Sequence, residues 1–260
     1  MRKTALITGA SSGIGLELAR VFAEKGNNLV LVARNKKKLD ELRVDLQNEY
    51  RVLIHVIEKD LSVENAPREV YEEIKKQDIV IDYLVNNAGF GNSGFFHETE
   101  WDNDFQMINL NVISLTQFCK LFLKDMVERK NGKIMNVAST AAFQPGPLMA
   151  VYYATKAFVL HFSEAIHNEL SGKGVTVTAL CPGATQSDFL SIARIEDTNL
   201  VKGKILPTSR EVAVFGYKKM MKGSPVAIHG FLNYLLANSV RFTPRSLVRK
   251  IVRKIQDKSK

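Results

Sequence analysis

Residues 4–15 read TALITGASSGIG, a five-residue strand-like run followed by a turn that holds three glycines. Leu16–Lys25 then places apolar residues at three- and four-residue spacing, which predicts a helix. Glycine lets the backbone approach a phosphate without a Cβ in the way, and a helix N-terminus offers free N–H groups to an anion. We predict a strand, a phosphate-holding turn and a helix. The residues expected at the phosphates are Gly9, Ser11, Ser12, Gly13, Ile14 and Gly15.

The glycine spacing itself leaves an alternative open. It is Gly-x-x-x-Gly-x-Gly, whereas the common dinucleotide fingerprint is Gly-x-Gly-x-x-Gly. A glycine turn that binds no ligand would have the same sequence. The position between a first strand and a first helix favours the nucleotide site.

Strand and helix patterns alternate along the rest of the chain. The predicted strands are Thr4–Thr8, Asn28–Ala33, Val52–Ile57, Tyr83–Asn86, Lys133–Val137, Val175–Leu180 and Pro225–His229. Near-continuous apolar runs are typical of strands buried on both faces, and the segments between them, such as Phe105–Val127, have helical spacing. We predict an α/β fold in which residues 1–260 form a single domain: a Rossmann-type doubly wound parallel sheet of about seven strands with helices on both faces.

Residues 186–210 interrupt this alternation. The stretch from Gln186 to Pro207 is polar and mixed, and it shows no clear helix or strand pattern. A loop of this length in a compact domain is usually functional or disordered. We expect it to close over a substrate, and an ordinary surface excursion is the alternative.

The composition is that of an ordinary globular protein, 45% hydrophobic and 24% charged. Cys119 and Cys181 lack the spacing of a zinc site or a disulfide framework, and His161 and His167 do not share a helix face, so we expect no metal. No stretch approaches the ~20 apolar residues that a membrane-spanning helix needs. A soluble protein of the reducing cytoplasm is expected.

Positive charge is concentrated in the last twenty residues. Residues 241–260 hold eight basic residues and one acidic residue, a net +7 of the total +9. A basic amphipathic helix is predicted at about 243–257, with an apolar stripe at Leu247, Val248, Ile251, Val252 and Ile255. It could lie on an anionic membrane, bind an acidic partner, or dock on its own body or on a twin subunit. We expect no nucleic acid, because no base-stacking aromatic residues alternate with these charges.

Three residues in the middle of the chain could carry acid–base chemistry. Ser139 follows the fifth predicted strand, and Tyr152 and Lys156 lie one turn apart on a helix predicted over Ala150–Leu170. A free tyrosine has a pKa near ~10 and exchanges protons poorly at neutral pH. Because an ammonium and a cationic nicotinamide favour the phenolate, we expect the pKa of Tyr152 to be lowered. Tyr152 could then exchange a proton with a carbonyl or an alcohol while Ser139 hydrogen-bonds the same oxygen.

The end of the second predicted strand bears on the choice of dinucleotide. Ala33 stands where an NAD site normally has a carboxylate for the ribose 2′-hydroxyl, and Arg34 follows it. No acidic residue appears between Ala33 and Asp40. Because Arg can hold a phosphate through two hydrogen bonds, we predict NADP(H) as the cofactor. Lys36–Lys38, which come next, are also typical of a solvated helix start.

These motifs together resemble the short-chain dehydrogenase/reductase family. The resemblance covers about residues 3–190 in motif order and nearly the whole chain in length. It rests on Thr8–Gly15, Asp60-Leu61, Asn86–Gly89, Asn109–Val112, Ser139, Tyr152–Lys156 and Pro182–Thr185.

The resemblance implies cofactor contacts at the matching positions. Asp60 and Leu61 would lie beside the adenine. Asn87, Ala88 and Gly89 would lie under the nicotinamide-side ribose, whose hydroxyls Lys156 would bond. The segment expected to meet the carboxamide is Pro182, Gly183 and Thr185.

The resemblance also implies a catalytic set of Ser139, Tyr152, Lys156 and Asn111. Asn111 would hold a water in a proton relay toward the lysine, and it fits the pattern better than Asn109. The thirteen-residue gap from the serine selects Tyr152 over the neighbouring Tyr153. Thr140 is a possible backup hydroxyl.

The expected function is an NADPH-dependent carbonyl reductase, with Tyr152 as the proton donor. The resemblance to bacterial ketone and 3-oxoacyl reductases implies a 3-oxoacyl thioester or another apolar ketone as substrate. A nucleotide sensor or scaffold with incidental catalysis is the alternative. Family members assemble through the helices that hold Asn111 and Tyr152, which implies a homodimer or homotetramer. Trp101 and Phe105, which open the first of these helices, are expected to be packing residues.

Overall fold

The computed structural model describes residues 2–258, in which seven parallel strands form one sheet in the order β3-β2-β1-β4-β5-β6-β7. The predicted doubly wound fold is confirmed. The third strand begins two residues later than predicted. The strands are β1 Thr4–Thr8, β2 Asn28–Ala33, β3 Ile54–Glu58, β4 Tyr83–Asn86, β5 Gly132–Val137, β6 Val175–Cys181 and β7 Val226–Ile228.

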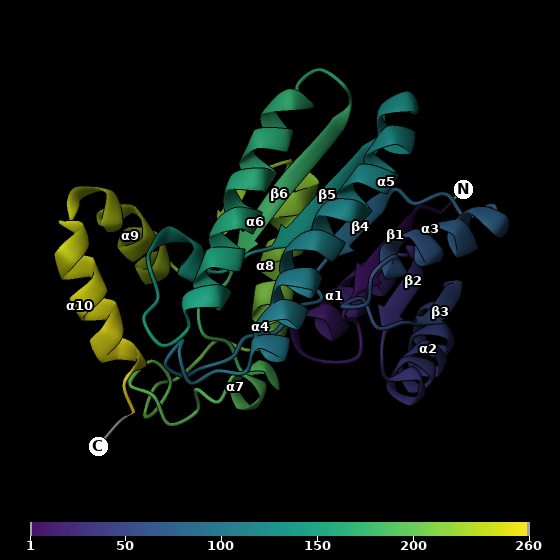
Figure 1. The fold of residues 1–260 in the computed structure, drawn as a ribbon. Helices are drawn as coiled ribbons and strands as arrows, with labels where there is room; N and C mark the ends of the chain where they lie inside the picture. The colour runs from purple at the N-terminus through teal and green to yellow at the C-terminus, as the bar shows by residue number, and fades with distance from the viewer. Residues whose placement is uncertain (1, 259–260) are drawn as a thin grey trace.

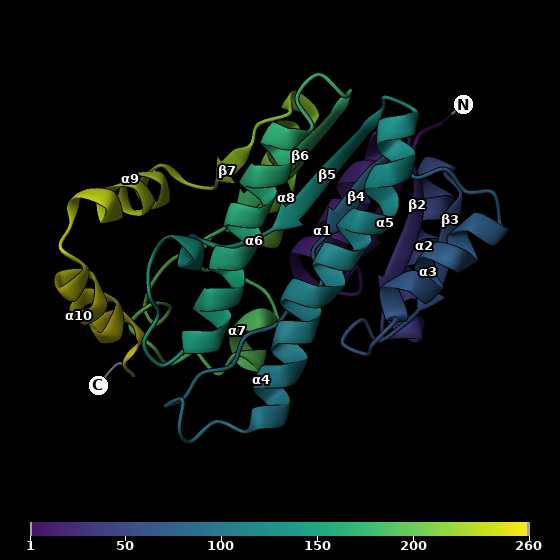
Figure 2. The same ribbon diagram turned by 45° about the horizontal axis from the view of Figure 1, so that its top comes forward.

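Helices cover both faces of the sheet (Figures 1 and 2). One face carries α1 Gly13–Glu24, α2 Lys36–Tyr50 and α8 Ser209–Lys222. The other carries α3 Ala66–Lys76, α5 Leu115–Glu128 and α6 Ala150–Glu169.

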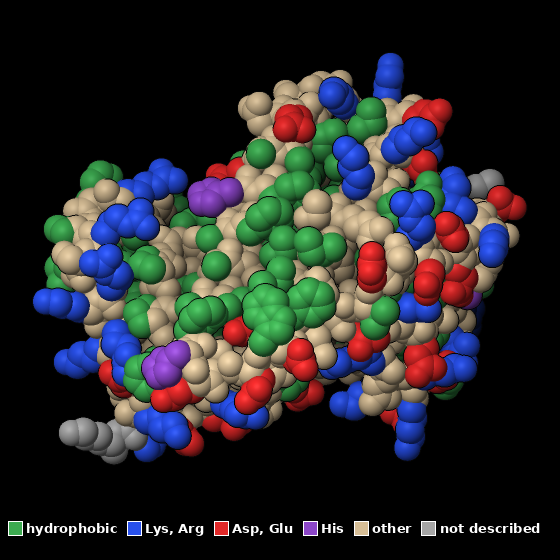
Figure 3. Space-filling view, in the orientation of Figure 1, with side chains coloured by type: hydrophobic (Ala, Val, Ile, Leu, Met, Phe, Trp, Pro, Cys, Tyr) green, Lys and Arg blue, Asp and Glu red, His purple; other side chains and the backbone are tan. Residues whose placement is uncertain are grey.

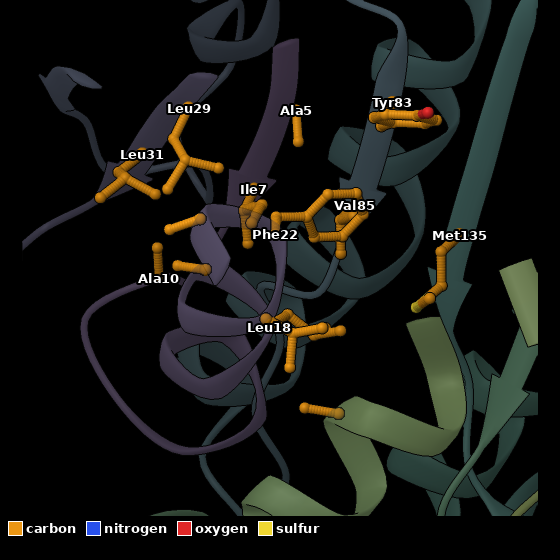
Figure 4. Packing of buried hydrophobic residues seen from close by; sticks show 14 of the residues in the cluster. Ala5, Ile7, Ala10, Leu18, Phe22, Leu29, Leu31, Tyr83, Val85 and Met135 are labelled. Atoms are coloured by element: carbon orange, nitrogen blue, oxygen red, sulfur yellow. The ribbon is translucent and has the colours of Figure 1, made fainter. Parts of the chain in front are cut away.

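The two cores follow from the alternation of side chains along each strand. In β1, Ala5 and Ile7 pack against α1, whereas Leu6 points into the opposite core. Phe22 of α1 is fully buried, and its ring lies 5.4 Å from that of Tyr83 (Figure 4). Packing on both faces explains why the strands are apolar throughout.

The helix predicted over Phe105–Val127 is interrupted. It consists of α4 Trp101–Ile108, a π-helical segment Asn109–Ser114, and α5. Trp101 and Phe105, expected to be packing residues, are 65% and 49% exposed, so that expectation is wrong. They face outward because buried Met107 takes the inner face of α4.

The segment 186–210 is folded rather than featureless. It contains the short helix α7 Phe189–Ile192, and Gln186 pairs with Thr208 in a parallel bridge. Ala193 and Ile195 are buried. The sequence pattern did not reveal this short helix. Ala193 and Ile195 belong to the same buried apolar cluster as Val248 and Val252.

The chain ends in helices that leave the sheet. The last elements are α9 Phe231–Ser239, a 3₁₀ turn Val240–Phe242 and α10 Arg245–Gln256. A further 3₁₀ turn, Thr140–Phe143, lies much earlier in the chain, between β5 and α6. Of the predicted apolar stripe, Val248 and Val252 are buried against the body. Within residues 2–258 no helix has both the length and the apolar character to cross a membrane.

Candidate active site

A cleft of about 570 Å³ opens at the carboxyl ends of the strands. Ligands of open α/β sheets bind at this edge, outside the strand ends. All predicted site residues except Gly15 and Asn111 line it. These are Gly9, Ser11, Ser12, Gly13, Ile14, Arg34, Asp60, Leu61, Asn87, Ala88, Gly89, Ser139, Tyr152, Lys156, Pro182, Gly183 and Thr185.

The glycine turn presents bare backbone to the cleft. Gly9 and Gly13 have φ of +66° and +55°, a region that favours glycine. Gly15 lies behind the turn, where a Cβ would collide with the Gly9 carbonyl oxygen. Gly15 therefore lets α1 pack against the turn and does not itself face the cleft.

Thr8 and Asn87 join the ends of β1 and β4. The Asn87 side chain donates to the carbonyl oxygens of Thr8 (2.9 Å) and Gly9 (3.2 Å). The Thr8 hydroxyl oxygen accepts the N–H groups of Asn87 and Ala88, each at 3.0 Å. These bonds hold the central segment of the cleft floor against the glycine turn.

The far end of the cleft carries positive charge. Arg34 follows β2 and its side chain is 73% exposed, with Nη1 3.9 Å from Asp60 Oδ2. Asp60 is itself fixed by hydrogen bonds from the Ser62 N–H and hydroxyl, at 2.9 and 2.7 Å. Arg34 is thus held near the cleft while its guanidinium stays open to solvent.

Ser139, Tyr152 and Lys156 meet in the middle of the cleft. Tyr152 and Lys156 are 8% and 6% exposed, and the Lys156 ammonium lies 5.8 Å from the centroid of the Tyr152 ring. Lys156 donates a 2.7 Å hydrogen bond to the Val137 carbonyl oxygen at the end of β5. The one-turn spacing on α6 places both groups on the cleft face, as predicted.

The expected direction of the Tyr152 pKa is wrong for this structure. Burial raises the pKa of Tyr152 well above its usual value, although the adjacent Ser139 side chain lowers it. Burial also lowers the pKa of Lys156 from 10.5 to about 8. The loss of water around a buried phenolate outweighs the attraction of the nearby ammonium. Like an ordinary tyrosine, Tyr152 carries its proton at neutral pH, and burial reinforces this.

Asn111 lies behind the cleft wall, in the π-helical segment. Its Nδ2 donates to the Phe90 carbonyl oxygen (3.0 Å) and to Thr155 Oγ1 (3.1 Å), and its Oδ1 accepts the Phe90 N–H at 3.2 Å. A Cβ at Gly89 would lie 2.8 Å from Asn111 Oδ1 and 3.5 Å from the Lys156 ammonium nitrogen. Asn111 thus fixes the segment that borders Lys156, while the predicted water relay stays a prediction.

Tyr153 and Gln256 form a contact that the sequence did not suggest. Gln256, the last residue of α10, donates a 2.6 Å hydrogen bond to the Tyr153 hydroxyl. Both residues line the cleft, and Gln256 Oε1 is buried with no hydrogen-bond partner among residues 2–258. The available signal was that Gln256 follows Val252 by four residues and so lies on the buried face of the helix. Tyr153 anchors α10, which leaves Tyr152 as the phenol beside Lys156.

The remaining wall of the cleft is apolar. Phe189 of α7 packs on Tyr152 with ring centroids 5.3 Å apart. Leu190 and Ile192 from α7, and Val252 and Ile255 from α10, also line the cleft. Two segments that are distant in sequence therefore enclose the space in front of the phenol. Among residues 2–258, no group of three or more His, Cys, Asp or Glu side chains is suited to hold a metal ion.

Comparison with known proteins gives a family and a fold. A family model described as short chain dehydrogenase matches residues 3–197. The very-long-chain 3-oxoacyl-CoA reductase of Homo sapiens is 35% identical over 184 residues, which are 68% of this chain. The chain spans only 58% of the length of that relative.

Two solved structures cover nearly the whole chain. A short-chain dehydrogenase from Sphingobium yanoikuyae in complex with NADPH has a TM-score of 0.83 at 33% identity, covering 92% of this chain and 94% of that one. A bulky-bulky ketone specific alcohol dehydrogenase from Comamonas testosteroni has a TM-score of 0.79 at 32% identity, covering 95% of each chain.

Proposed function

This chain belongs to the short-chain dehydrogenase family, as its motifs predicted, and from that premise we propose that it is an NADPH-dependent reductase of bulky, apolar ketones. The observation that carries the proposal is the meeting of Ser139, Tyr152 and Lys156 in the cleft that also contains the glycine turn.

The cleft fits a dinucleotide. Gly9 and Gly13 adopt positive φ, and the N-terminus of α1 lies at the cleft, where its backbone N–H groups can receive a pyrophosphate. A Cβ at Gly9 would come within 2.8 Å of Asn87 Nδ2, so a residue with a side chain would collide with Asn87 at this position. The turn thus has the bare backbone and the helix dipole that a pyrophosphate requires.

Arg34 supports NADP(H) over NAD(H). Its exposed guanidinium beside the cleft can take a ribose 2′-phosphate, and Ala33 offers no carboxylate to a 2′-hydroxyl. The related Sphingobium yanoikuyae enzyme, solved with NADPH, supports the same choice.

The residues around Tyr152 suit the direction of reduction. When bound, NADPH supplies the hydride. Tyr152 carries its proton at neutral pH, as an ordinary tyrosine does, so its hydroxyl can donate that proton to the oxygen of a ketone as negative charge develops there. Ser139 holds that oxygen by a hydrogen bond, and the Lys156 ammonium stabilises the phenolate that remains. Phe189 excludes water from this exchange.

The apolar walls support a bulky ketone as substrate. Side chains from α7 and α10 enclose the space in front of Tyr152, and they offer large aliphatic surfaces. The Comamonas testosteroni relative, a bulky-bulky ketone specific enzyme, supports this class, and the 3-oxoacyl-CoA reductase supports a 3-oxoacyl thioester within it.

The exposed apolar face of α4 supports a homodimer. Trp101, Phe105, Ile113 and Phe158 are 41–65% exposed and come from α4, the π-helical segment and α6. They belong to the side of the molecule where Figure 3 shows an apolar patch over α4 and between α5 and α6. Light scattering would report twice the monomer mass, and a Trp101→Ser/Phe105→Ser variant would be monomeric.

We propose the cytoplasm as the compartment in which this protein acts.

The decisive experiment follows the loss of NADPH absorbance with a panel of ketones, aldehydes and 3-oxoacyl thioesters. Tyr152→Phe should lower kcat at least ~10²-fold, the usual scale for losing an acid–base group, while the Kd for NADPH changes little. Tyr153→Phe is the matched control and should stay within ~10-fold of the parent. Tight NADPH binding with no turnover across the panel would instead favour a nucleotide sensor.

A further inference from the structure

The last two helices expose an unusual amount of apolar surface. Of the twenty large apolar residues that are exposed among residues 2–258, eight lie between residues 231 and 251. They are Phe231, Leu232, Tyr234, Leu235, Leu236, Phe242, Leu247 and Ile251. Phe242, in the turn between α9 and α10, is 89% exposed. Exposed apolar patches of this kind mark sites of interaction.

The same helices carry only positive charge. No Asp or Glu occurs between Glu211 and Asp257, and Asp257 is paired with Arg253 at 2.9 Å. The basic side chains of this region are Arg241, Arg245, Arg249, Lys250, Arg253, Lys254 and Lys258. Figure 3 shows Lys and Arg side chains among apolar ones at the end of the molecule that holds α9 and α10.

The inward faces of both helices are already occupied. Ala237 of α9 and Val248, Val252 and Gln256 of α10 are buried against the body. On α10, Leu247 and Ile251 lie about 100–140° from Val252, so the apolar stripe continues past the buried seam onto a solvent-exposed flank. The apolar face of α10 therefore extends beyond the part that is buried against the body.

We propose that α9 and α10 bind the surface of an anionic lipid bilayer. Aromatic and aliphatic side chains would enter the headgroup boundary, while the long Lys and Arg side chains reach the lipid phosphates around them. A second copy of this chain is a poor occupant, because the contact would bring two surfaces of the same charge together. The two helices lie at the end of the molecule opposite α2 and α3, where nothing hinders approach to a flat surface (Figures 1 and 2).

Bilayer binding would also bear on the cleft, a consequence that rests on the proposed function. Leu236, Ala237, Val252 and Ile255 line the cleft from the same two helices that carry the exposed surface. An apolar ketone dissolved in the bilayer would then enter the cleft beside the helices that hold the protein there. Vesicle binding itself needs neither cofactor nor turnover, so the two proposals can fail separately.

The test is sedimentation of the full chain with vesicles of phosphatidylcholine alone and of phosphatidylcholine mixed with phosphatidylglycerol. We expect at least ~10-fold stronger partitioning onto the anionic vesicles, weakened by salt. Phe231→Ser/Leu232→Ser/Phe242→Ser and Lys250→Glu/Lys254→Glu should each lower the partition coefficient at least ~10-fold. All five side chains are exposed, so melting curves should match the parent.

Matched controls come from the other end of the molecule. Val44→Ser/Leu53→Ser removes exposed apolar residues elsewhere, and Lys120→Glu/Lys124→Glu reverses two exposed charges on α5. Both should partition within ~2-fold of the parent. Absence of vesicle binding, or equal loss in the controls, would overturn the proposal. A dimer that only the Phe231→Ser/Leu232→Ser/Phe242→Ser variant dissociates would also overturn it. The same holds for binding to polyglutamate that depends on the basic residues but not on the apolar ones.

Discussion

Replacing Lys156 by methionine should stabilise the protein while it removes the ammonium that serves Tyr152. Burial lowers the pKa of Lys156 from 10.5 to about 8, so keeping this side chain charged at neutral pH costs the folded state about 3 kcal/mol. Loss of the hydrogen bond to the Val137 carbonyl offsets ~1–2 kcal/mol of this. The net gain is about 1–2 kcal/mol, a rise in Tm of ~2–8 °C for a chain of this size. Turnover should fall sharply in the same variant.

The size of the gain should depend on pH. The unfolded chain binds the Lys156 proton more tightly than the folded protein does, so the parent gains stability as pH rises from about 8 toward 10.5. The advantage of the methionine variant should therefore shrink by about 2 kcal/mol between pH 7 and about pH 9.5.

Urea unfolding followed by circular dichroism at both pH values measures this difference. Lys120→Met, at an exposed position of α5, is the control and should show no pH-dependent gain. A methionine variant less stable than the parent at pH 7, or an advantage that does not change with pH, would refute the reasoning.

Two further predictions concern the cofactor end and the wall of the cleft. Arg34→Ala should raise the Kd for NADPH about 10-fold while the Kd for NADH stays unchanged, since only the 2′-phosphate loses a partner; fluorescence titration measures both, and an equal loss for the two cofactors would argue against this role. Asn111→Ala should lower the free energy of unfolding by about 1–3 kcal/mol, because it removes the side-chain partner of the Phe90 N–H and carbonyl groups. Urea unfolding checks the second prediction, and an unchanged midpoint would show that water replaces the amide.

The strands were predictable from sequence because both of their faces are buried. Runs such as Leu29–Val32 are apolar at every position, which is unambiguous when read alone. The third strand was placed two residues too early because Val52 and Leu53 extend the apolar run, yet Leu53 is 73% exposed. Hydropathy does not reveal where a ladder of backbone hydrogen bonds begins.

The candidate site was predictable where its motifs are local, and less so where it depends on distant contacts. The glycine turn and the Tyr152–Lys156 pair each lie within one or two adjacent elements. Gln256, in contrast, lies at the cleft next to Tyr153, its hydrogen-bond partner, which is 103 positions earlier in the chain. The pKa of Tyr152 depends on burial by α7 and other distant segments, which no count of nearby charges includes.

The π-helical segment Asn109–Ser114 constrains the number of residues in the continuous helix formed by α4, this segment and α5. Its extra residue puts α4 and α5 out of phase by about 100° relative to a regular α-helix, and the buried Met107 lies before it while the buried Phe118 lies after it. Deleting one residue from Asn109–Ser114 would restore regular backbone pairing and yet misdirect one of these two side chains. A helix shortened by one residue would thus have regular backbone hydrogen bonds but a misplaced buried side chain. The length of this helix is therefore constrained by the packing on either side of the π-helical segment.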